Sequence, residues 1–588
     1  MPLIQKPRAK VLVTEKLSND GMALLRTSLD VDEHKNLSPK ELLSKIPEYN
    51  ALIIRSETQV TDLVLQAARN LKVVARAGVG VDNVDVSEAT RLGIVVVNSP
   101  SGNIGAAAEH TIALMMALAR NIPEACASLK SGKWERSKFI GVEMKGKVLG
   151  IIGLGKVGLI VARLAKGLGM TINALDPYAS LSVAASASVN LVPSLPELLS
   201  CSDFVTIHTP LIASTRGMIG AAELAQMKTG ARILNVARGG TIDEDALLAA
   251  LESGHLAGAA VDVFTTEPPT SDTTPGKLIA HPKVIATPHL GASTVEAQEN
   301  VSVDVCEQVL EILNGSLPRS AVNAPLILPE EYQKLQPFVR LVEKIGSLYT
   351  QQYAILPGGS MTRNTFDLIY QGEVAGIHNT RPLYAALIKG LLAPISASEG
   401  FNINIVNAEL IAHERGIFVS EQHSRDPSDS SSYSSLVTLV ARPPSRAPSR
   451  APGVTESSSS APQQQQRIIC GTCSGNRPLI TRLDRFEASF EPQGNLLICV
   501  NYDSPGKIGV VGSILGREGV NINFMIVAPV SPKLRDNYDE GDAQLTEKEK
   551  LDSTEALMIL GIDQAVPEQA TAALVKEGGV LSASAITL

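Results

Sequence analysis

A glycine-rich turn constrains the fold of this chain more than any other feature of its sequence. In the stretch GIIGLGKVG, Gly153, Gly155 and Gly158 stand in the spacing G-x-G-x-x-G, after an apolar run and before the helical stretch LIVARLAKGLG. The spacing alone is weakly specific. However, Asp176 ends the next apolar run, at roughly the 20-residue distance of a dinucleotide fingerprint. The alternative, a purely structural glycine turn, is disfavoured by this complete context, so we predict a dinucleotide site.

Each residue of the turn has a physical role in such a site. Gly153 permits the tight turn, Gly155 lets the backbone approach a pyrophosphate, and Gly158 lets the helix pack closely on the strand. The helix N-terminus attracts phosphates. Asp176 can accept hydrogen bonds from ribose hydroxyls and would repel a 2′-phosphate, which favours NAD over NADP.

Short apolar runs alternate with helical stretches up to about residue 325, which is typical of parallel sheets wound by helices. A long helix at about 105–120 separates a first set of four runs from a second set of six, and six strands match one doubly wound domain. The runs of the first set are KVLVTE, ALIIRSE, LKVVARAG and GIVVVNSP, and those of the second are KVLGIIG, TINALDP, DFVTIHTP, ARILNVARGG, GAAVDVF and KVIATPHL.

We therefore predict an α/β chain with two doubly wound domains, one flavodoxin-like and one Rossmann, followed by an α+β domain and a smaller βαββαβ domain. A helix at about 294–314 can fold back on the first set of strands, so the first domain is predicted to be discontinuous. The predicted boundaries are 8–104 with 291–325, 105–290, 326–490 and 491–588.

Two polar segments interrupt the last two domains. Residues 441–466 consist largely of Pro, Ser, Ala and Gln, and such a segment cannot bury enough apolar surface to offset its ordering entropy. We predict a disordered insertion there. Residues 531–554, rich in Asp, Glu and Lys, form a second predicted insertion.

Composition excludes several classes of protein. The net charge of −8 argues against a sequence-independent nucleic-acid binder, which needs clustered Lys and Arg. No apolar run reaches the ~18 residues of a membrane span, and the N-terminus enters a strand too early for a cleaved signal. We expect a cytoplasmic protein with neither a membrane nor a nucleic-acid partner. CGTC at 470–473 has redox-pair spacing but follows a β-type run, so we expect ordinary thiols, and no metal site is predicted.

Three ionisable residues of complementary type follow three successive predicted strands: Arg238, Glu267 and His289. Ligands bind at the carboxyl ends of strands in such sheets. An arginine between glycines can grip a carboxylate, while a carboxylate can orient a histidine that acts as a base. The alternatives are a surface arginine, an exposed acid and a histidine that caps the helix after GAST. His208 also ends a strand but lacks an acidic partner in the loop that follows, and His110 is expected to lie on the long helix and to be packed, not catalytic.

GLGKVG, NVARGG, TTEPP and PHLGAST together resemble the D-isomer-specific 2-hydroxyacid dehydrogenases, and the likeness covers residues 8–325. The resemblance implies that Arg238 anchors the substrate, that His289 is the acid–base and that Glu267 orients it. One departure is Val79, where RAGTG is common in the family. The implied cofactor is NAD, with contacts at Val79, Gly153, Gly155, Lys156, Val157, Gly158, Asp176, Thr209, Val236, Arg238, Asp262, His289 and Gly291.

RAGVGVDNVD and SGKWERSKFIGVEMKGKVLGIIGLG resemble the family members that oxidise 3-phosphoglycerate to 3-phosphohydroxypyruvate at the start of serine synthesis. The substrate phosphate would need cations, which Arg55 and Arg76 could supply at two strand ends. The alternative is two ordinary solvated arginines. Asn103 is a further candidate for substrate binding.

The C-terminal half resembles the long members of the family. INIVNAELIAHERGI is similar to their anion-binding intervening domain, and the stretch after residue 490 resembles an ACT domain, which binds amino acids. The resemblance implies a homo-oligomer, a tetramer, with L-serine as a possible effector bound where two such domains pair, held by Asp503 of one chain and Asn521 of the other. Some serine-inhibited relatives have a tyrosine two residues before the aspartate; here that position is Asn501, and Tyr502 follows one residue later.

Two other functions compete with this interpretation. An NAD-sensing corepressor shares the fold and similar Arg, Glu and His residues but lacks an ACT domain. A glyoxylate or hydroxypyruvate reductase is disfavoured by Arg55, Arg76 and the long C-terminal half.

Overall fold

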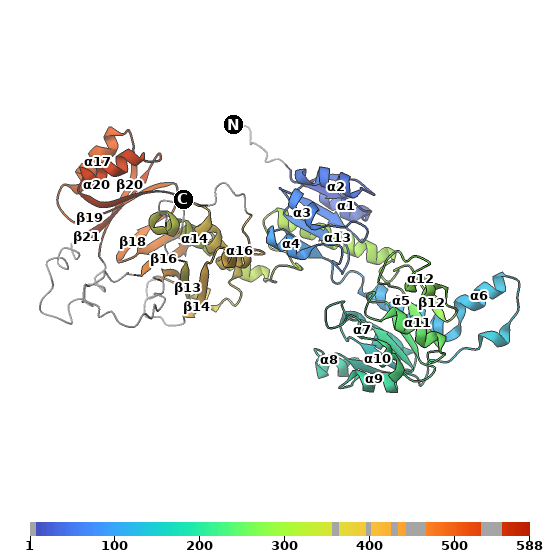
Figure 1. Cartoon of the computed structure of the whole chain (residues 1–588). Helices are drawn as coiled ribbons and strands as arrows, with labels where there is room; N and C mark the ends of the chain where they lie inside the picture. Colours follow the sequence, from blue (N-terminus) through green and yellow to red (C-terminus); the bar gives the residue numbers. More distant parts are fainter. Residues whose placement is uncertain (1–7, 355–363, 396–401, 425–432, 443–465, 531–554) are drawn as a thin grey trace, which may run out of the picture.

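The computed structural model describes residues 8–354, 364–395, 402–424, 433–442, 466–530 and 555–588. Four sheets follow one another along this part of the chain (Figure 1). The first two are parallel and wound by helices, the third is mixed and the fourth is antiparallel. The doubly wound architecture predicted for the N-terminal half is confirmed by these sheets.

The first sheet has the strand order β2-β1-β3-β4-β5, which is the flavodoxin-like order. Four of these strands were predicted, and the prediction missed β2, with the sequence DVDE. β2 lies at the edge, pairs only with β1 and has no buried residue, so it carries no apolar run. The strands are β1 (Lys10–Val13), β2 (Asp30–Glu33), β3 (Ala51–Ile54), β4 (Val73–Arg76) and β5 (Val95–Asn98).

Five helices cover the first sheet. The helix α13 belongs to a much later part of the chain, yet it packs against α1, and its buried Val301, Val305 and Val309 share one core with Val11 and Val13. The chain therefore returns to its first sheet after completing the second. The helices are α1 (Asn19–Arg26), α2 (Pro39–Lys45), α3 (Asp62–Ala67), α4 (Val86–Arg91) and α13 (Val295–Leu313).

The second sheet has the order β12-β11-β10-β9-β6-β7-β8, a Rossmann sheet with one added strand. Six strands were predicted; the missed seventh, β8, is two residues long and lies at the edge. The strands are β6 (Val148–Ile152), β7 (Thr171–Leu175), β8 (Asn190–Leu191), β9 (Phe204–Ile207), β10 (Arg232–Asn235), β11 (Gly258–Val261) and β12 (Val284–Ala286). The helices are α5 (Ile104–Arg120), α6 (Ile122–Lys130), α7 (Lys156–Gly167), α8 (Leu181–Ser186), α9 (Leu195–Cys201), α10 (Ala221–Gln226), α11 (Glu244–Glu252) and α12 (Thr274–Ala280).

The register of the second sheet brings its loops together. Ile207 of β9 pairs with Ile152 of β6 and with Asn235 of β10, and β11 continues the row as Val261 pairs with Asn235 and with Ala286. All these strands end at one level. The loops that follow them therefore meet along one edge of the sheet, where parallel sheets bind ligands.

The third sheet has the order β14-β13-β15-β16-β17-β18, with β13 and β14 parallel and the other neighbours antiparallel. Most of the predicted insertion 441–466 lies outside the described residues, and its ends meet where Ala441 pairs with Arg467. CGTC lies in β16, where burial raises the pKa of the Cys473 thiol to about 12. The elements are α14 (Pro329–Tyr349), β13 (Thr365–Gly372), α15 (Arg381–Leu392), α16 (Ala408–Glu414), β14 (Phe418–Ser424), β15 (Ser435–Ala441), β16 (Arg467–Ser474), β17 (Arg477–Leu483) and β18 (Phe486–Phe490).

The fourth sheet confirms the predicted βαββαβ order and has the strand order β20-β21-β19-β22. Two helices cover one of its faces, while Leu496, Ile498 and Leu557 join the core of the third sheet. The predicted insertion 531–554 lies outside the described residues. The elements are β19 (Asn495–Tyr502), α17 (Lys507–Arg517), β20 (Ile522–Pro529), β21 (Glu555–Ile562), α20 (Glu568–Lys576) and β22 (Val580–Thr587).

In the part of the chain that the structure describes, no single helix is long and apolar enough to cross a membrane. The bent pair of α5 and α6 meets the criteria of length and composition together.

Candidate active site

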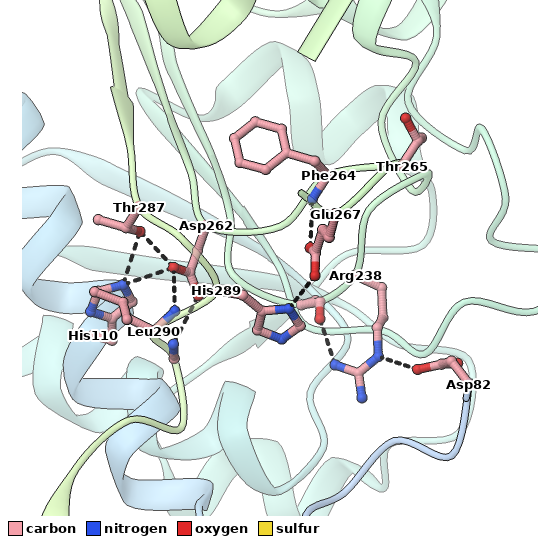
Figure 2. Close-up of polar contacts among 12 residues, drawn as sticks. Asp82, His110, Arg238, Asp262, Phe264, Thr265, Glu267, Thr287, His289 and Leu290 are labelled. Atoms are coloured by element: carbon pink, nitrogen blue, oxygen red, sulfur yellow. Dashed lines mark hydrogen bonds and ion pairs between the residues drawn. The ribbon is translucent and has the colours of Figure 1, made fainter. Parts of the chain in front are cut away.

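His289 lies just after β12, on the edge where the loops meet, and forms a hydrogen bond with Glu267. The distance from His289 Nδ1 to Glu267 Oε2 is 2.7 Å (Figure 2). The backbone of His289 has a φ of 53°, in the left-handed region that few residues adopt outside turns and functional sites. Both side chains are partly exposed, 45% for His289 and 37% for Glu267, so the pair is accessible to a small molecule.

Glu267 is held as a carboxylate. Its Oε1 accepts a hydrogen bond from the Phe264 amide at 2.9 Å. Burial raises the pKa of Glu267, but the hydrogen bonds from His289 and from the Phe264 amide outweigh it, so the pKa lies below its ordinary value of 4.5. An ionised carboxylate only accepts, so His289 Nδ1 carries a proton and Nε2 is left as a proton acceptor.

Arg238 lies in the loop after β10, and this loop is built for close approach. Asn235 holds it by donating to the Arg238 carbonyl at 2.9 Å. A side chain at Gly239 would clash with the Phe264 carbonyl, so glycine brings the Arg238 loop against the loop that carries Glu267. The Arg238 guanidinium faces Asp82 of the first sheet's loops, with Nε 3.3 Å from its carboxylate (Figure 2). Sequence reasoning missed Asp82.

A second cation stands beside Arg238. Arg76 ends β4, and the burial of its guanidinium together with the charge of Arg238 lowers its pKa to about 10. It therefore stays charged at neutral pH. Its Nε is buried without a hydrogen-bond partner among the described residues. A partly buried cation next to another cation, with a donor unused, is suited to an anionic ligand.

Arg55 and Asn103 are placed less tightly. Arg55 lies just after β3, half-buried, and is close enough to Arg76 to lower the pKa of that guanidinium. Its Nη1 contacts the Lys16 carbonyl at 3.5 Å. Asn103 precedes the first residue of α5, and its side chain forms no capping hydrogen bond there.

The glycine-rich turn has the geometry that a dinucleotide needs. Gly153 has a φ of 93°, and a Cβ there would lie 2.6 Å from the His208 carbonyl, so only glycine fits. A Cβ at Gly158 would clash with the Gly153 carbonyl. At Gly155, in contrast, a Cβ would meet no atom within 4 Å, which leaves open space at the start of α7. That space faces the helix N-terminus, where phosphates are stabilised.

Two polar residues contact the glycine-rich turn. The Thr209 hydroxyl is buried and has no hydrogen-bond partner among the described residues. An orphaned buried hydroxyl is costly unless a ligand completes it. Asp176 follows β7, and its carboxylate accepts from the Leu154 and Tyr178 amides, both at 2.8 Å. The residues of this edge therefore fit NAD.

The remaining predicted cofactor contacts belong to both parallel-sheet regions. Lys156 opens α7, and its Nζ donates to Ser101 at 2.9 Å, which links the two parallel-sheet regions. Asn98 donates to the Val79 carbonyl. Val157 and Val236 belong to the apolar core of the second sheet, and Gly291 packs against Val236.

Asp262 is fully buried and holds the loop that carries His289. Its carboxylate accepts from the Leu290 and Gly291 amides at 2.8 Å and from the Thr287 hydroxyl at 2.5 Å. Burial raises the pKa of Asp262, but the hydrogen bonds from His110, Thr287 and Leu290 lower it to a net value below the ordinary one. Asp262 was predicted as a cofactor contact from its motif alone; its structural role in the loop was not foreseen.

His208 differs from His289 in its surroundings. Burial lowers its pKa to about 4, and its Nε2 lies 3.1 Å from the Thr206 hydroxyl. A histidine of that pKa is a weak proton acceptor at neutral pH. The low pKa of His208 and the contact of His289 with Glu267 favour His289 as the base.

Two family models match the chain. The NAD binding domain of D-isomer specific 2-hydroxyacid dehydrogenases matches residues 112–291, and the intervening domain of D-3-phosphoglycerate dehydrogenase matches residues 334–460. A D-3-phosphoglycerate dehydrogenase from Synechocystis sp. is 41% identical over 580 residues, which cover 99% of this chain and 95% of the relative. The chain belongs to the D-3-phosphoglycerate dehydrogenase family.

Other relatives agree with this assignment. The chloroplastic D-3-phosphoglycerate dehydrogenase 2 of Arabidopsis thaliana is 44% identical over 527 residues, covering 90% of this chain and 81% of the relative. Among solved structures, a protein from Thermus thermophilus is 34% identical with a TM-score of 0.50, and the match covers 53% of this chain and 99% of that one. As in other members of the family, the second sheet of this dehydrogenase is an NAD-binding domain.

The two residues predicted to bind an effector are far apart within one chain. Asp503 follows the end of β19, and Asn521 precedes the start of β20. Through β21, the start of β20 is level with Asn495 at the opposite end of β19. The two residues thus lie at opposite ends of the sheet, roughly 24 Å apart at the usual rise along a strand. They can share a ligand only if it lies between two chains.

The pair of Glu267 and His289 predicts a change in pH dependence. In Glu267→Gln, a neutral amide stabilises the imidazolium less than a carboxylate does. The acid limb of the pH–kcat/KM profile should therefore shift to lower pH by about 1 unit. The profile is measured in the direction of NAD reduction, where His289 must be neutral to accept a proton. An acid limb that stays in place would show that the carboxylate does not set the behaviour of the histidine.

Proposed function

We propose that this protein oxidises 3-phospho-D-glycerate to 3-phosphohydroxypyruvate with NAD, the first step of phosphorylated L-serine synthesis. The observation that carries the proposal is the His289–Glu267 pair at 2.7 Å, located on the same edge of the second sheet as Arg238, which pairs with Asp82 of the first sheet's loops. Full-length relatives that carry the D-3-phosphoglycerate dehydrogenase name support the choice of substrate.

The residues of the site divide the work of the reaction. Arg238 would hold the substrate carboxylate, because a guanidinium matches a carboxylate with two parallel hydrogen bonds. His289 Nε2 would accept the proton of the C2 hydroxyl, and the Glu267 carboxylate would stabilise the imidazolium that forms. NAD, when bound, supplies the acceptor for the hydride from C2. Gly155, Thr209 and Asp176 would hold that cofactor.

Asp82 adds a step to substrate binding. Its carboxylate already pairs with Arg238 Nε at 3.3 Å and is 69% exposed, so it is only loosely held. A substrate carboxylate would compete with Asp82 for the guanidinium. Arg76, together with Arg55, would then hold the phosphate, because these cations stand at the ends of two neighbouring strands of the first sheet and Arg76 is close enough to Arg238 to feel its charge.

Assays with other substrates separate this proposal from its competitors. A glyoxylate or hydroxypyruvate reductase would turn over those acids with NADH much faster than it oxidises 3-phosphoglycerate. A corepressor would bind NADH without turnover of any of the three. The proposal requires 3-phosphoglycerate with NAD, or 3-phosphohydroxypyruvate with NADH, to give the highest kcat/KM.

We further propose that L-serine inhibits the enzyme at its C-terminal βαββαβ domain. The support is the fold of that domain and the exposed Asp503, whose carboxylate can hold an ammonium group. Because Asp503 and Asn521 lie at opposite ends of one sheet, the site would form between two chains, so the proposal includes a homo-oligomer, a tetramer. The cytoplasmic location expected from the sequence stays a prediction.

The serine site makes a direct prediction. Millimolar L-serine should lower activity several-fold, the usual scale for a coupling of about 1–3 kcal/mol, and Asp503→Ala should abolish this inhibition. The uninhibited rate should not change, since Asp503 is far from His289 in the fold. The matched control is Glu577→Ala, because Glu577 is an exposed acid of the same domain. Asp563 is also exposed but is not suitable, because it accepts a hydrogen bond from the Asn521 amide. Inhibition that survives Asp503→Ala would place serine elsewhere.

A further inference from the structure

His110 is an ionisable side chain near the site for which the reaction above has no use. It lies on α5 and is 20% exposed. Its Nε2 lies 3.3 Å from Asp262 Oδ1 and 3.2 Å from the Thr287 hydroxyl oxygen (Figure 2). Three separate elements meet in this cluster: the helix α5, the end of β11 and the loop after β12.

The hydrogen bonds of the cluster fix the direction of each donor. Thr287 has one hydroxyl hydrogen, and it is committed to Asp262 Oδ1 at 2.5 Å. The Thr287 oxygen can therefore only accept from His110. The pKa of Asp262 is lowered, so its carboxylate is ionised and also only accepts. It follows that His110 Nε2 carries a hydrogen and donates to both partners.

The same carboxylate sets the backbone around His289. The Asp262 carboxylate accepts hydrogen bonds from the amides of Leu290 and Gly291, the two residues after His289. The backbone carbonyl of Asp262 accepts from the His289 amide at 2.9 Å. These bonds hold His289 in its left-handed conformation, with a φ of 53°. Any shift of the Asp262 carboxylate would move the loop, and with it the ring that faces Glu267.

We propose that His110 is a positioning residue for catalysis: it anchors the Asp262 carboxylate and the Thr287 hydroxyl, and through them keeps His289 aligned with Glu267. This role rests on the proposed function, because it assumes that His289 is the base. His110 itself touches neither Glu267 nor His289 among the contacts of the structure.

Two substitutions of His110 test the role in the full-length enzyme. His110→Leu removes the donor while keeping an apolar side chain of similar bulk. His110→Gln keeps an amide donor near the position of Nε2. A matched control is His255→Leu, because His255 also bonds through Nε2, to the Leu224 carbonyl at 3.1 Å, but belongs to a different part of the same sheet region.

A small displacement of a catalytic group lowers the rate of the chemical step strongly. The kcat of His110→Leu should therefore fall by about ten- to a hundred-fold. KM for 3-phosphoglycerate and the affinity for NAD should change by less than about three-fold, since the binding cations are untouched. His110→Gln should recover most of the lost kcat, and His255→Leu should keep the wild-type kcat. If His110 had only a structural role, His110→Leu would lower the melting temperature without a selective loss of kcat, and His110→Gln would not restore kcat.

Hydrogen exchange gives a second readout that does not depend on activity. The Leu290 and Gly291 amides donate to Asp262, so the peptide that contains them should exchange faster in His110→Leu than in wild type and in His110→Gln. If His110→Leu exchanged faster in this way but the wild-type enzyme did not oxidise 3-phosphoglycerate, the proposed function would fail while the anchoring role of His110 stood. Unchanged exchange in His110→Leu, or a wild-type kcat in that variant, would overturn the inference.

Discussion

Replacing His289 with Asn should lower kcat for 3-phosphoglycerate oxidation by about 10² or more, the usual loss when a positioned base is removed. Asparagine keeps a polar side chain of similar size and tolerates the left-handed φ of this position, so the loop should keep its shape. The amide cannot accept the proton of the substrate hydroxyl at neutral pH. Steady-state NADH formation measures the effect.

NAD binding provides the control for this variant. The glycine-rich turn, Thr209 and Asp176 belong to loops other than that of His289, so the dissociation constant of NAD, measured by fluorescence titration, should stay within about three-fold of wild type. Turnover close to the wild-type rate would exclude His289 as the base. His208, the other histidine at a strand end, would then need the same test despite its pKa of about 4.

Replacing Arg76 with Ala should cost the phosphorylated substrate far more than an unphosphorylated one. A charge-assisted hydrogen bond to a buried group contributes about 1.5–3 kcal/mol, so kcat/KM for 3-phosphoglycerate should fall by about ten- to a hundred-fold. Turnover of D-glycerate, which lacks the phosphate, should change little. The comparison of the two substrates separates loss of a phosphate contact from general damage.

An exposed arginine of the same domain serves as the matched control. Arg69 follows α3 and points to solvent, so Arg69→Ala removes an equal charge without opening the site. It should leave both kcat/KM values unchanged. Equal losses on both substrates in Arg76→Ala would mean that Arg76 supports the fold or the carboxylate site and does not read the phosphate.

Local sequence patterns predicted the elements that bury apolar side chains and the turn that needs glycine. The runs that became β6 and β9 were found because nearly all their residues are buried. β2 and β8 were missed for the opposite reason: they lie at sheet edges, and an edge strand pairs on one side only and needs no apolar run. The Gly153 turn was predicted because its φ of 93° requires glycine, and glycines at that spacing are a recognisable motif.

Residues of the site were predictable when each ended a strand of the same sheet. The sequence places Glu267 and His289 after β11 and β12, and parallel strands bring such loops to one edge. The partners of Asp262 were not predictable in this way. His110 reaches it from the middle of a helix that precedes the whole sheet, and only the packing of α5 against the strands reveals the contact. Asp82 was missed similarly, because it crosses from the first sheet's loops to Arg238.

We propose that this NAD-dependent dehydrogenase selects its substrate by the phosphate. The most direct test is kcat/KM for NADH formation from 3-phospho-D-glycerate and from D-glycerate, measured with purified full-length enzyme under the same conditions. The phosphorylated acid should be preferred by about a hundred-fold or more in kcat/KM, as two charge-assisted arginine contacts would give. Equal use of the two acids, or oxidation of neither, would contradict this proposal.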